Sequence, residues 1–124
     1  MRRAAWIYAA LTAVVVAFHA AVILGAPLGD LTMGGRWPGV LPWQGRLASA
    51  LSMALLAVLT GIVLARAGLL QWRLPGWTIW AVVAVQAVAV VEHLVTPSPA
   101  ERALWLPVIV VMLACAVVVA RRRG

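Results

Sequence analysis

Three side chains that could carry chemistry stand near the ends of long apolar segments: His19, Glu92 and His93. Two histidines and a carboxylate can bind a metal ion, shuttle a proton or ligate haem. Counted from the start of its apolar segment (residue 4 or 76), His19 lies about 15 residues along and His93 about 17, so their depths differ by about 3 Å in helices rising 1.5 Å per residue. If the two helices are neighbours, the imidazoles meet near one membrane surface, with Glu92 beside them.

These residues are the site candidates: His19 and His93 for a cofactor such as haem, and the same pair with Glu92 for a metal ion. Their local spacing matches no ligand motif, and Glu92 and His93 lie close enough to a helix end to be hydrated. The favoured interpretation is therefore structural or interfacial, and we expect no cofactor. Proton or ion handling and metal or haem binding remain the alternatives.

Other polar side chains inside the apolar segments form stripes at helical spacing. They are Tyr8 and Thr12 with His19, then Ser49, Ser52 and Thr60, and finally Gln86 with His93. Small and hydroxyl-bearing residues commonly form the contact surfaces of membrane helices. We therefore expect these stripes to face one another and to join the helices by hydrogen bonds, and the small residues Ala57, Gly61 and Ala65 to add a close contact.

The elements that must position these side chains are four apolar segments, at residues 4–24, 47–65, 76–95 and 104–120. The chain has 124 residues, is 65% hydrophobic and has a mean hydropathy of +1.05, which is too apolar for a small soluble globule. Each segment is close to the roughly 20 residues that a spanning helix needs. The sequence predicts an all-α fold: an antiparallel four-helix transmembrane bundle in one integral membrane domain, residues 1–124.

The basic residues indicate topology rather than nucleic-acid binding, because they flank the apolar segments. The net charge is +7, and all basic residues are arginine. With a cytoplasmic N-terminus, the inner side holds Arg2, Arg3, Arg66, Arg73, Arg121, Arg122 and Arg123, and the outer side holds Arg36, Arg46 and Arg102. This bias places both termini in the cytoplasm. The composition, rich in Ala, Val and Arg and lacking lysine, suggests the inner membrane of a bacterium.

The Gly/Pro-rich outer loop between the first two helices, residues 25–46, differs from a flexible linker. It holds six glycines and three prolines but also large apolar residues such as Leu31 and Met33. We expect it to fold back over the outer end of the bundle as a cap. In the next outer loop, Ser98 or Pro99 can begin a helix that has Glu101 in its first turn.

Several short stretches carry a resemblance to a known group. They are Gly25-Ala26-Pro27-Leu28-Gly29, Met33-Gly34-Gly35-Arg36, Pro38-Gly39-Val40-Leu41-Pro42, Arg46, Ser49, Ser98, Glu101-Arg102 and Pro107. The pattern resembles an uncharacterised family of small bacterial four-helix integral membrane proteins, and it implies that fold but no activity. In that family we expect asparagine near the end of the third helix, where this chain has Glu92 and His93. That departure weakens the metal or haem alternative.

No catalytic motif of the nucleophile-elbow, HExxH or phosphate-loop type is present in the sequence, so we expect a protein that is not an enzyme. The leading prediction is an accessory or scaffold subunit that lies in the lipid bilayer and binds itself or a larger membrane complex. The alternative is a small transporter or channel, which needs a polar path through the bilayer centre. Only Thr60 and Gln86 lie near that centre.

Overall fold

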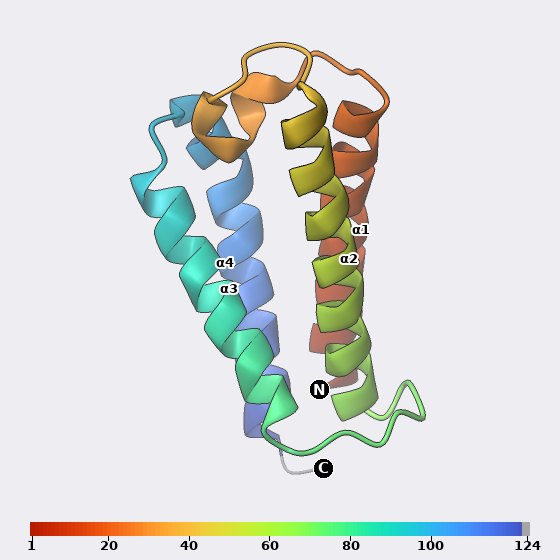
Figure 1. Cartoon of the computed structure of the whole chain (residues 1–124). Helices are drawn as coiled ribbons and strands as arrows, with labels where there is room; N and C mark the ends of the chain where they lie inside the picture. Colours follow the sequence, from red (N-terminus) through yellow and green to blue (C-terminus); the bar gives the residue numbers. More distant parts are fainter. Residues whose placement is uncertain (123–124) are drawn as a thin grey trace.

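The structure, a computed structural model, describes residues 1–122 as four long α-helices and two short 3-10 turns (Figure 1). In chain order the elements are α1 (Arg2–Ile23), η1 (Gly29–Leu31), η2 (Met33–Gly35), α2 (Trp43–Arg66), α3 (Thr78–Val95) and α4 (Pro99–Arg121). Each of the four α-helices is long and apolar enough to cross a membrane. The predicted all-α, antiparallel four-helix bundle is confirmed, and the chain is a multi-pass membrane protein.

Two helices begin well before the apolar segments predicted at residues 47–65 and 104–120. The second starts at Trp43 and the fourth at Pro99. Capping rather than hydropathy sets the start of α4: the Ser98 side chain accepts a hydrogen bond from the Glu101 backbone N–H, and Pro99 occupies the first helical position. The predicted helix start at Ser98 or Pro99 is thus confirmed.

The order of the helices around the bundle places α1 and α3 on a diagonal. Helix α1 packs against α2 and α4, and α3 packs mainly against α4, whereas the contact between α2 and α3 is sparse (Figure 1). The first and third helices are therefore not the neighbours on which a cluster of His19, Glu92 and His93 depended. Hydropathy locates spans but carries no information about which spans touch.

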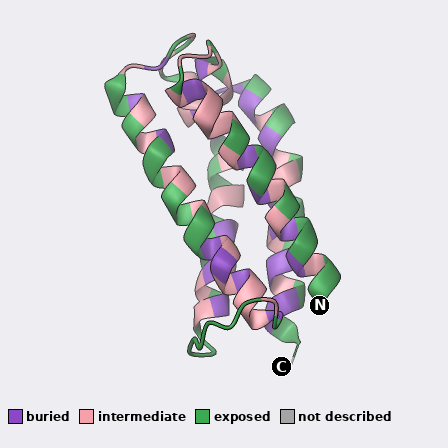
Figure 2. Cartoon of the chain, turned by 90° about the vertical axis from the view of Figure 1, so that its right-hand side faces the viewer, coloured by how far each residue is buried: buried purple, intermediate pink, exposed green. Residues whose placement is uncertain are grey.

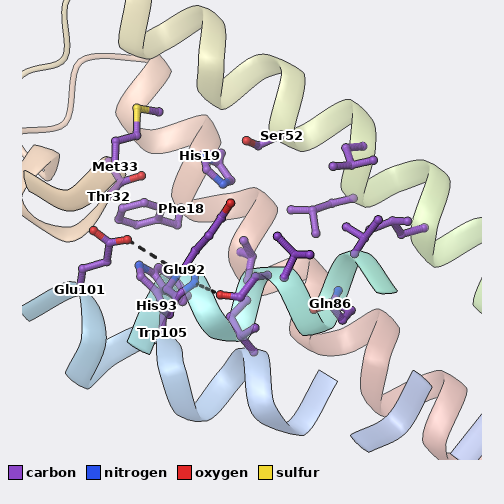
Figure 3. Close-up of a pocket in the computed structure, with 18 of the residues that line it drawn as sticks. Phe18, His19, Thr32, Met33, Ser52, Gln86, Glu92, His93, Glu101 and Trp105 are labelled. Carbon is purple, nitrogen blue, oxygen red and sulfur yellow. Dashed lines mark hydrogen bonds and ion pairs between the residues drawn. The ribbon is translucent and has the colours of Figure 1, made fainter. Parts of the chain in front are cut away.

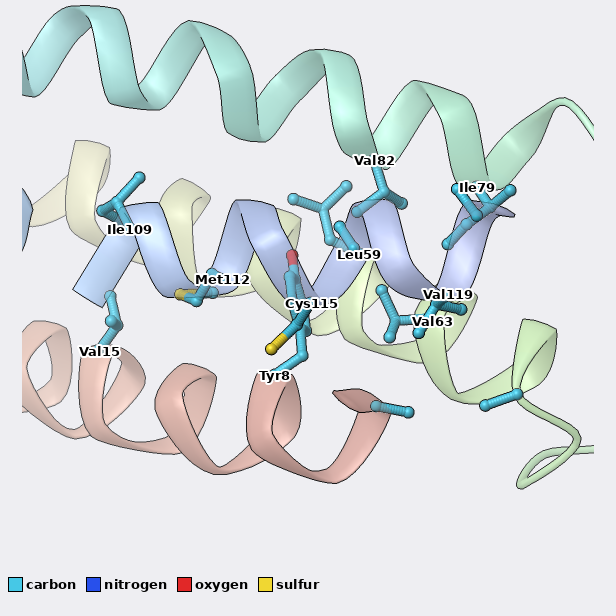
Figure 4. Packing of buried hydrophobic residues seen from close by; sticks show 14 of the residues in the cluster. Tyr8, Val15, Leu59, Val63, Ile79, Val82, Ile109, Met112, Cys115 and Val119 are labelled. Carbon is cyan, nitrogen blue, oxygen red and sulfur yellow. The ribbon is translucent and has the colours of Figure 1, made fainter. Parts of the chain in front are cut away.

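The closely packed core fills the half of the bundle that contains the start of α1 and the end of α4, called here the terminal half. Side chains from all four helices meet there, including Tyr8, Val63, Val82, Met112 and Val119, all fully buried (Figure 4). The outward faces are apolar and exposed along the length of the bundle (Figure 2). Lipid covers such faces, so packing and hydrogen bonds rather than hydrophobic burial join the helices.

The segment between α1 and α2, residues 24–42, covers the other end of the bundle and is called here the cap. Its backbone is tied to the start of α4: Asp30 O accepts from Ser98 Oγ at 2.6 Å, and Leu31 O accepts from Trp105 Nε1 at 2.9 Å. Gly34 and Gly35 have φ values of 68° and 72°, a region that glycine adopts without strain. The predicted cap is confirmed, and the adjoining part of the bundle is the cap half.

Candidate functional site

A cavity of about 560 Å³ lies directly beneath the cap, within the cap half of the bundle (Figure 3). Its walls are mostly apolar, and all four helices and the cap contribute to them. The polar side chains in its wall are His19, Thr32, Ser52, Gln86, Glu92, His93 and Glu101. A mainly apolar cavity of about 300–1,000 Å³ with a few polar groups is the usual form of a small-molecule site.

Gln86 is the most deeply buried polar residue of this wall, with 2% of its surface exposed. Its Nε2 donates to the Tyr8 hydroxyl at 2.6 Å, and its Oε1 has no partner among the described residues. The amide can be turned so that Oε1 accepts from Tyr8, but Nε2 is then the unpaired atom. Either way, one polar amide atom is unsatisfied in the wall, a condition that costs about 1–3 kcal/mol unless a ligand or water pairs with it.

Glu101 is the second buried polar centre, at the junction of the cap with α3 and α4. Its Oε2 accepts from the Gly34 backbone N–H at 2.7 Å and from Thr96 Oγ1 at 3.2 Å. Its Oε1 lies 3.8 Å from His93 Nε2. A single buried carboxylate therefore holds the cap, the α3–α4 turn and His93 together.

A hydrogen bond of Nδ1 determines which ring nitrogen of His93 carries a hydrogen. Nδ1 lies 2.7 Å from Ala89 O, and because a carbonyl only accepts, Nδ1 must carry the hydrogen. Nε2 is left facing Glu101, where a second proton on the ring would convert the contact into an ion pair. His93 is thus paired with α4, not with α1.

His19 stands on α1 and bonds to α2 instead. Its Nδ1 lies 3.0 Å from the hydroxyl oxygen of Ser49, which is fully buried. Glu92 is exposed on α3 at the rim of the cavity. The three candidates line one cavity but have separate surroundings, and within residues 1–122 no three His, Cys, Asp or Glu side chains are grouped so as to hold a metal ion.

The polar stripes join helices in pairs, as the sequence predicts. Thr60 Oγ1 donates to Thr12 Oγ1 at 3.0 Å, which adds a second α1–α2 bond to the one between His19 and Ser49. Gln86 and Tyr8 bridge the diagonal from α3 to α1. Gly61 has a different role from helix packing: a Cβ there would collide with the ring of Trp72, a residue of the α2–α3 linker.

The sequence analysis did not predict that Glu101 joins the cap to His93 and the α3–α4 turn. Ser98 and Glu101 have the spacing of a capping box, in which the glutamate returns to the backbone of the first residue. Here only the Ser98 half of that box forms, and the Glu101 carboxylate turns to Gly34 instead. The capping-box signal locates Glu101 at the helix start, but its partner lies 67 positions away in the chain.

The cavity is partly open at its side and is closed toward the terminal half of the bundle. Leu55 on α2 and Val85 and Val88 on α3 line it and are also exposed on the outside of the bundle, where α2 and α3 pack least. Toward the terminal half, Val82 and Met112 are fully buried and fill the interior. The exposed apolar part of its lining therefore lies on α2 and α3, and the cavity ends near the level of Gln86.

Comparison of the chain with protein-family models, with curated proteins and with solved structures finds no match.

Proposed function

We propose that this protein is a non-enzymatic binding protein of the membrane, which takes an amphipathic small molecule from the bilayer into the cavity beneath the cap. One observation carries this proposal: a mainly apolar cavity has in its wall a buried glutamine amide, one atom of which is unpaired among the described residues. A ligand with an apolar body would fill the space, and its hydroxyl, carbonyl or amine group would pair with the amide after a rotation of the Gln86 side chain, since the unpaired atom is itself buried.

The lateral opening supports a ligand that is dissolved in lipid. A molecule diffusing in the bilayer reaches Val85 and Val88 without crossing water, because these side chains are exposed on the lipid-facing side of α3. The inner wall adds aromatic groups: the Phe18 ring meets the Trp105 ring edge to face, with centroids 4.8 Å apart. Such a wall suits a flat or ring-containing apolar group.

The accessory or scaffold role, with a homo-oligomer or a larger membrane complex as partner, stays a prediction from the sequence. It is compatible with ligand binding, and the ligand could act on such an assembly. The transporter or channel alternative is less favoured, because the polar wall stops at Gln86 and the terminal half is closed by apolar side chains. The haem or metal alternative is also less favoured, because the two histidines have separate partners. His19 bonds to Ser49 on α2, whereas His93 bonds to Ala89 on its own helix and faces Glu101 on α4.

The proposed location is the inner membrane of a bacterium, with both termini cytoplasmic. The arginines support this orientation, because most of them lie at the end that holds the start of α1 and the end of α4. Under this orientation the cap and the cavity belong to the outer half of the bilayer.

Native mass spectrometry of the protein released from its own host membrane tests the proposal. We expect the wild-type protein to carry a bound molecule that the double variant Tyr8→Phe/Gln86→Leu has lost. Replacing both partners by apolar groups of similar shape leaves no new unpaired atom, so the fold should persist. The matched control is Gln44→Leu, which removes an exposed amide at the start of α2. A wild type without bound mass, or equal retention by the double variant, would contradict the proposal.

A further inference from the structure

A second cavity, of about 510 Å³, lies at the opposite end of the bundle and is independent of the one beneath the cap. Its walls come from the start of α1, the end of α2, the α2–α3 linker and the start of α3. The residues that give it chemical character are Arg2, Arg66, Trp72 and Thr78. Two arginines and no carboxylate side chain therefore line this cavity within the described part of the chain.

The charge around this cavity is not neutralised by acidic side chains of the chain. Asp30, Glu92 and Glu101, the three acidic residues, all lie at or beside the cap. The described arginines of the terminal end are Arg2, Arg3, Arg66, Arg73, Arg121 and Arg122. The acidic side chains thus lie at the cap end and most arginines at the terminal end, so the net positive charge of the terminal end attracts an anion.

Arg66 is the fixed member of the pair. One terminal nitrogen of its guanidinium donates to Arg122 O at 2.9 Å and to Ala120 O at 3.4 Å, the carbonyls at the end of α4. These bonds orient the group, and no carboxylate side chain of residues 1–122 forms an ion pair with it. Its Nε–H is buried and has no acceptor among the described residues. The buried Nε–H is closed to a ligand, but a planar guanidinium carries further N–H donors on its terminal nitrogens and is well suited to bind a phosphate oxygen.

The position of Trp72 in the wall depends on Gly61. Because Gly61 has no side chain, the Trp72 ring lies directly against α2, and the linker is held close to the helix. Thr78 Oγ1 donates to Pro75 O at 2.7 Å and fixes the other end of the linker. Tryptophan rings commonly lie at the level of lipid headgroups. The cavity therefore combines a cationic side with an indole at the expected depth of a headgroup.

From these contacts we infer that the terminal-end cavity binds the phosphate of an anionic phospholipid headgroup, held by Arg66 and Arg2. A basic pocket between membrane helices is the general form of such a site. Free phosphate offers the same oxygen chemistry, so the experiment must separate the lipid from the free anion.

Native mass spectrometry of the detergent-purified protein, titrated with phosphatidylglycerol, gives the test. Arg66→Gln and Arg2→Gln should each weaken lipid binding by about tenfold or more, the factor that corresponds to the roughly 1.5 kcal/mol of a hydrogen bond to a charged group. The matched control is Arg3→Gln, which removes the same charge from the same end but does not line the cavity. Phosphatidylcholine, whose headgroup has no net charge, should bind more weakly and respond little to the three changes.

Two further measurements identify the source of the phosphate and guard against unfolding. Failure of millimolar inorganic phosphate to displace phosphatidylglycerol is the expected result, and full displacement would reject the lipid as the ligand. Arg2 is exposed, so its variant should keep the fold even where Arg66→Gln loosens the end of α4. An Arg3→Gln effect as large as that of Arg2→Gln would overturn the site and leave only a diffuse attraction.

Discussion

The terminal half and the cap half of this bundle are built from the same four helices but differ in how they fill their interior. In the terminal half, Met112 and Val82 are fully buried in a continuous apolar core. In the cap half, the helices surround a cavity, and polar contacts centred on Glu101 hold the cap over it. The difference indicates that close packing is concentrated in the terminal half, and it agrees with the proposal that the cap half binds a ligand.

The largest effect should come from shortening a side chain of α4 in each half of the bundle and comparing the two losses of stability. Met112→Ala removes a side chain from the closed core and should lower the free energy of unfolding by about 2–5 kcal/mol. Ile109→Ala, one turn away in the wall of the cavity, should cost clearly less, because space already exists beside it. Reversible unfolding in mixed micelles measures both values, and equal losses would mean that the two halves are equally packed.

The next largest effect should come from the carboxylate that holds the cap. Glu101→Gln replaces hydrogen bonds to a charged group by neutral ones and should cost part of the roughly 1.5–3 kcal/mol typical of such bonds. Hydrogen exchange at the Gly34 amide should become faster, since that N–H donates to Glu101. Glu92→Gln is the control, because Glu92 is exposed. Unchanged exchange at Gly34 would show that other contacts hold the cap.

A smaller effect is expected for the hydroxyl pair between α1 and α2. A double-mutant cycle of Thr12→Val and Thr60→Val should give a coupling energy of about 0.6 kcal/mol, the average for such bonds in a membrane protein. The pair is 3.0 Å apart. A coupling energy near zero would mean that packing alone joins α1 and α2 at this pair. The polar contacts that contribute to stability would then lie mainly in the cap half.

The smallest change in stability should come from Gly61→Ala. Alanine favours a helix over glycine by about 1 kcal/mol, which offsets the cost of moving the Trp72 ring. The measurable change is local: the indole N–H resonance of Trp72 should shift, while that of Trp105 in the cap half should not. A Trp72 resonance that stays in place would show that the ring does not lie against Gly61.

Much of the fold, and part of the site, could be predicted from the sequence. Four runs of apolar residues predicted four spans, and the apolar residues of the Gly/Pro-rich loop predicted the cap. The loop side chains Leu31 and Met33 do line the cavity. His19 and His93 both line the cavity of the cap half, but their role as a cofactor or metal site stays a prediction. Their partners, Ser49 and Glu101, could not be assigned, because helical spacing gives the face of a helix but not the helix opposite.

The sequence by itself determined the features that a lipid bilayer requires of a spanning chain. These are the length, number and helical form of the spans, and the positions of the arginines at their ends. These follow from local properties, since about 20 apolar residues must satisfy their backbone groups within one helix. Only the tertiary structure decided that α1 and α3 lie on a diagonal, that one amide atom of Gln86 is unpaired among residues 1–122, and that Glu101 binds Gly34. Each of these depends on contacts between residues far apart in the chain. Apolar side chains contact lipid as readily as one another, so hydropathy does not determine which helices are neighbours, and hydrogen bonds between polar side chains help to select the arrangement.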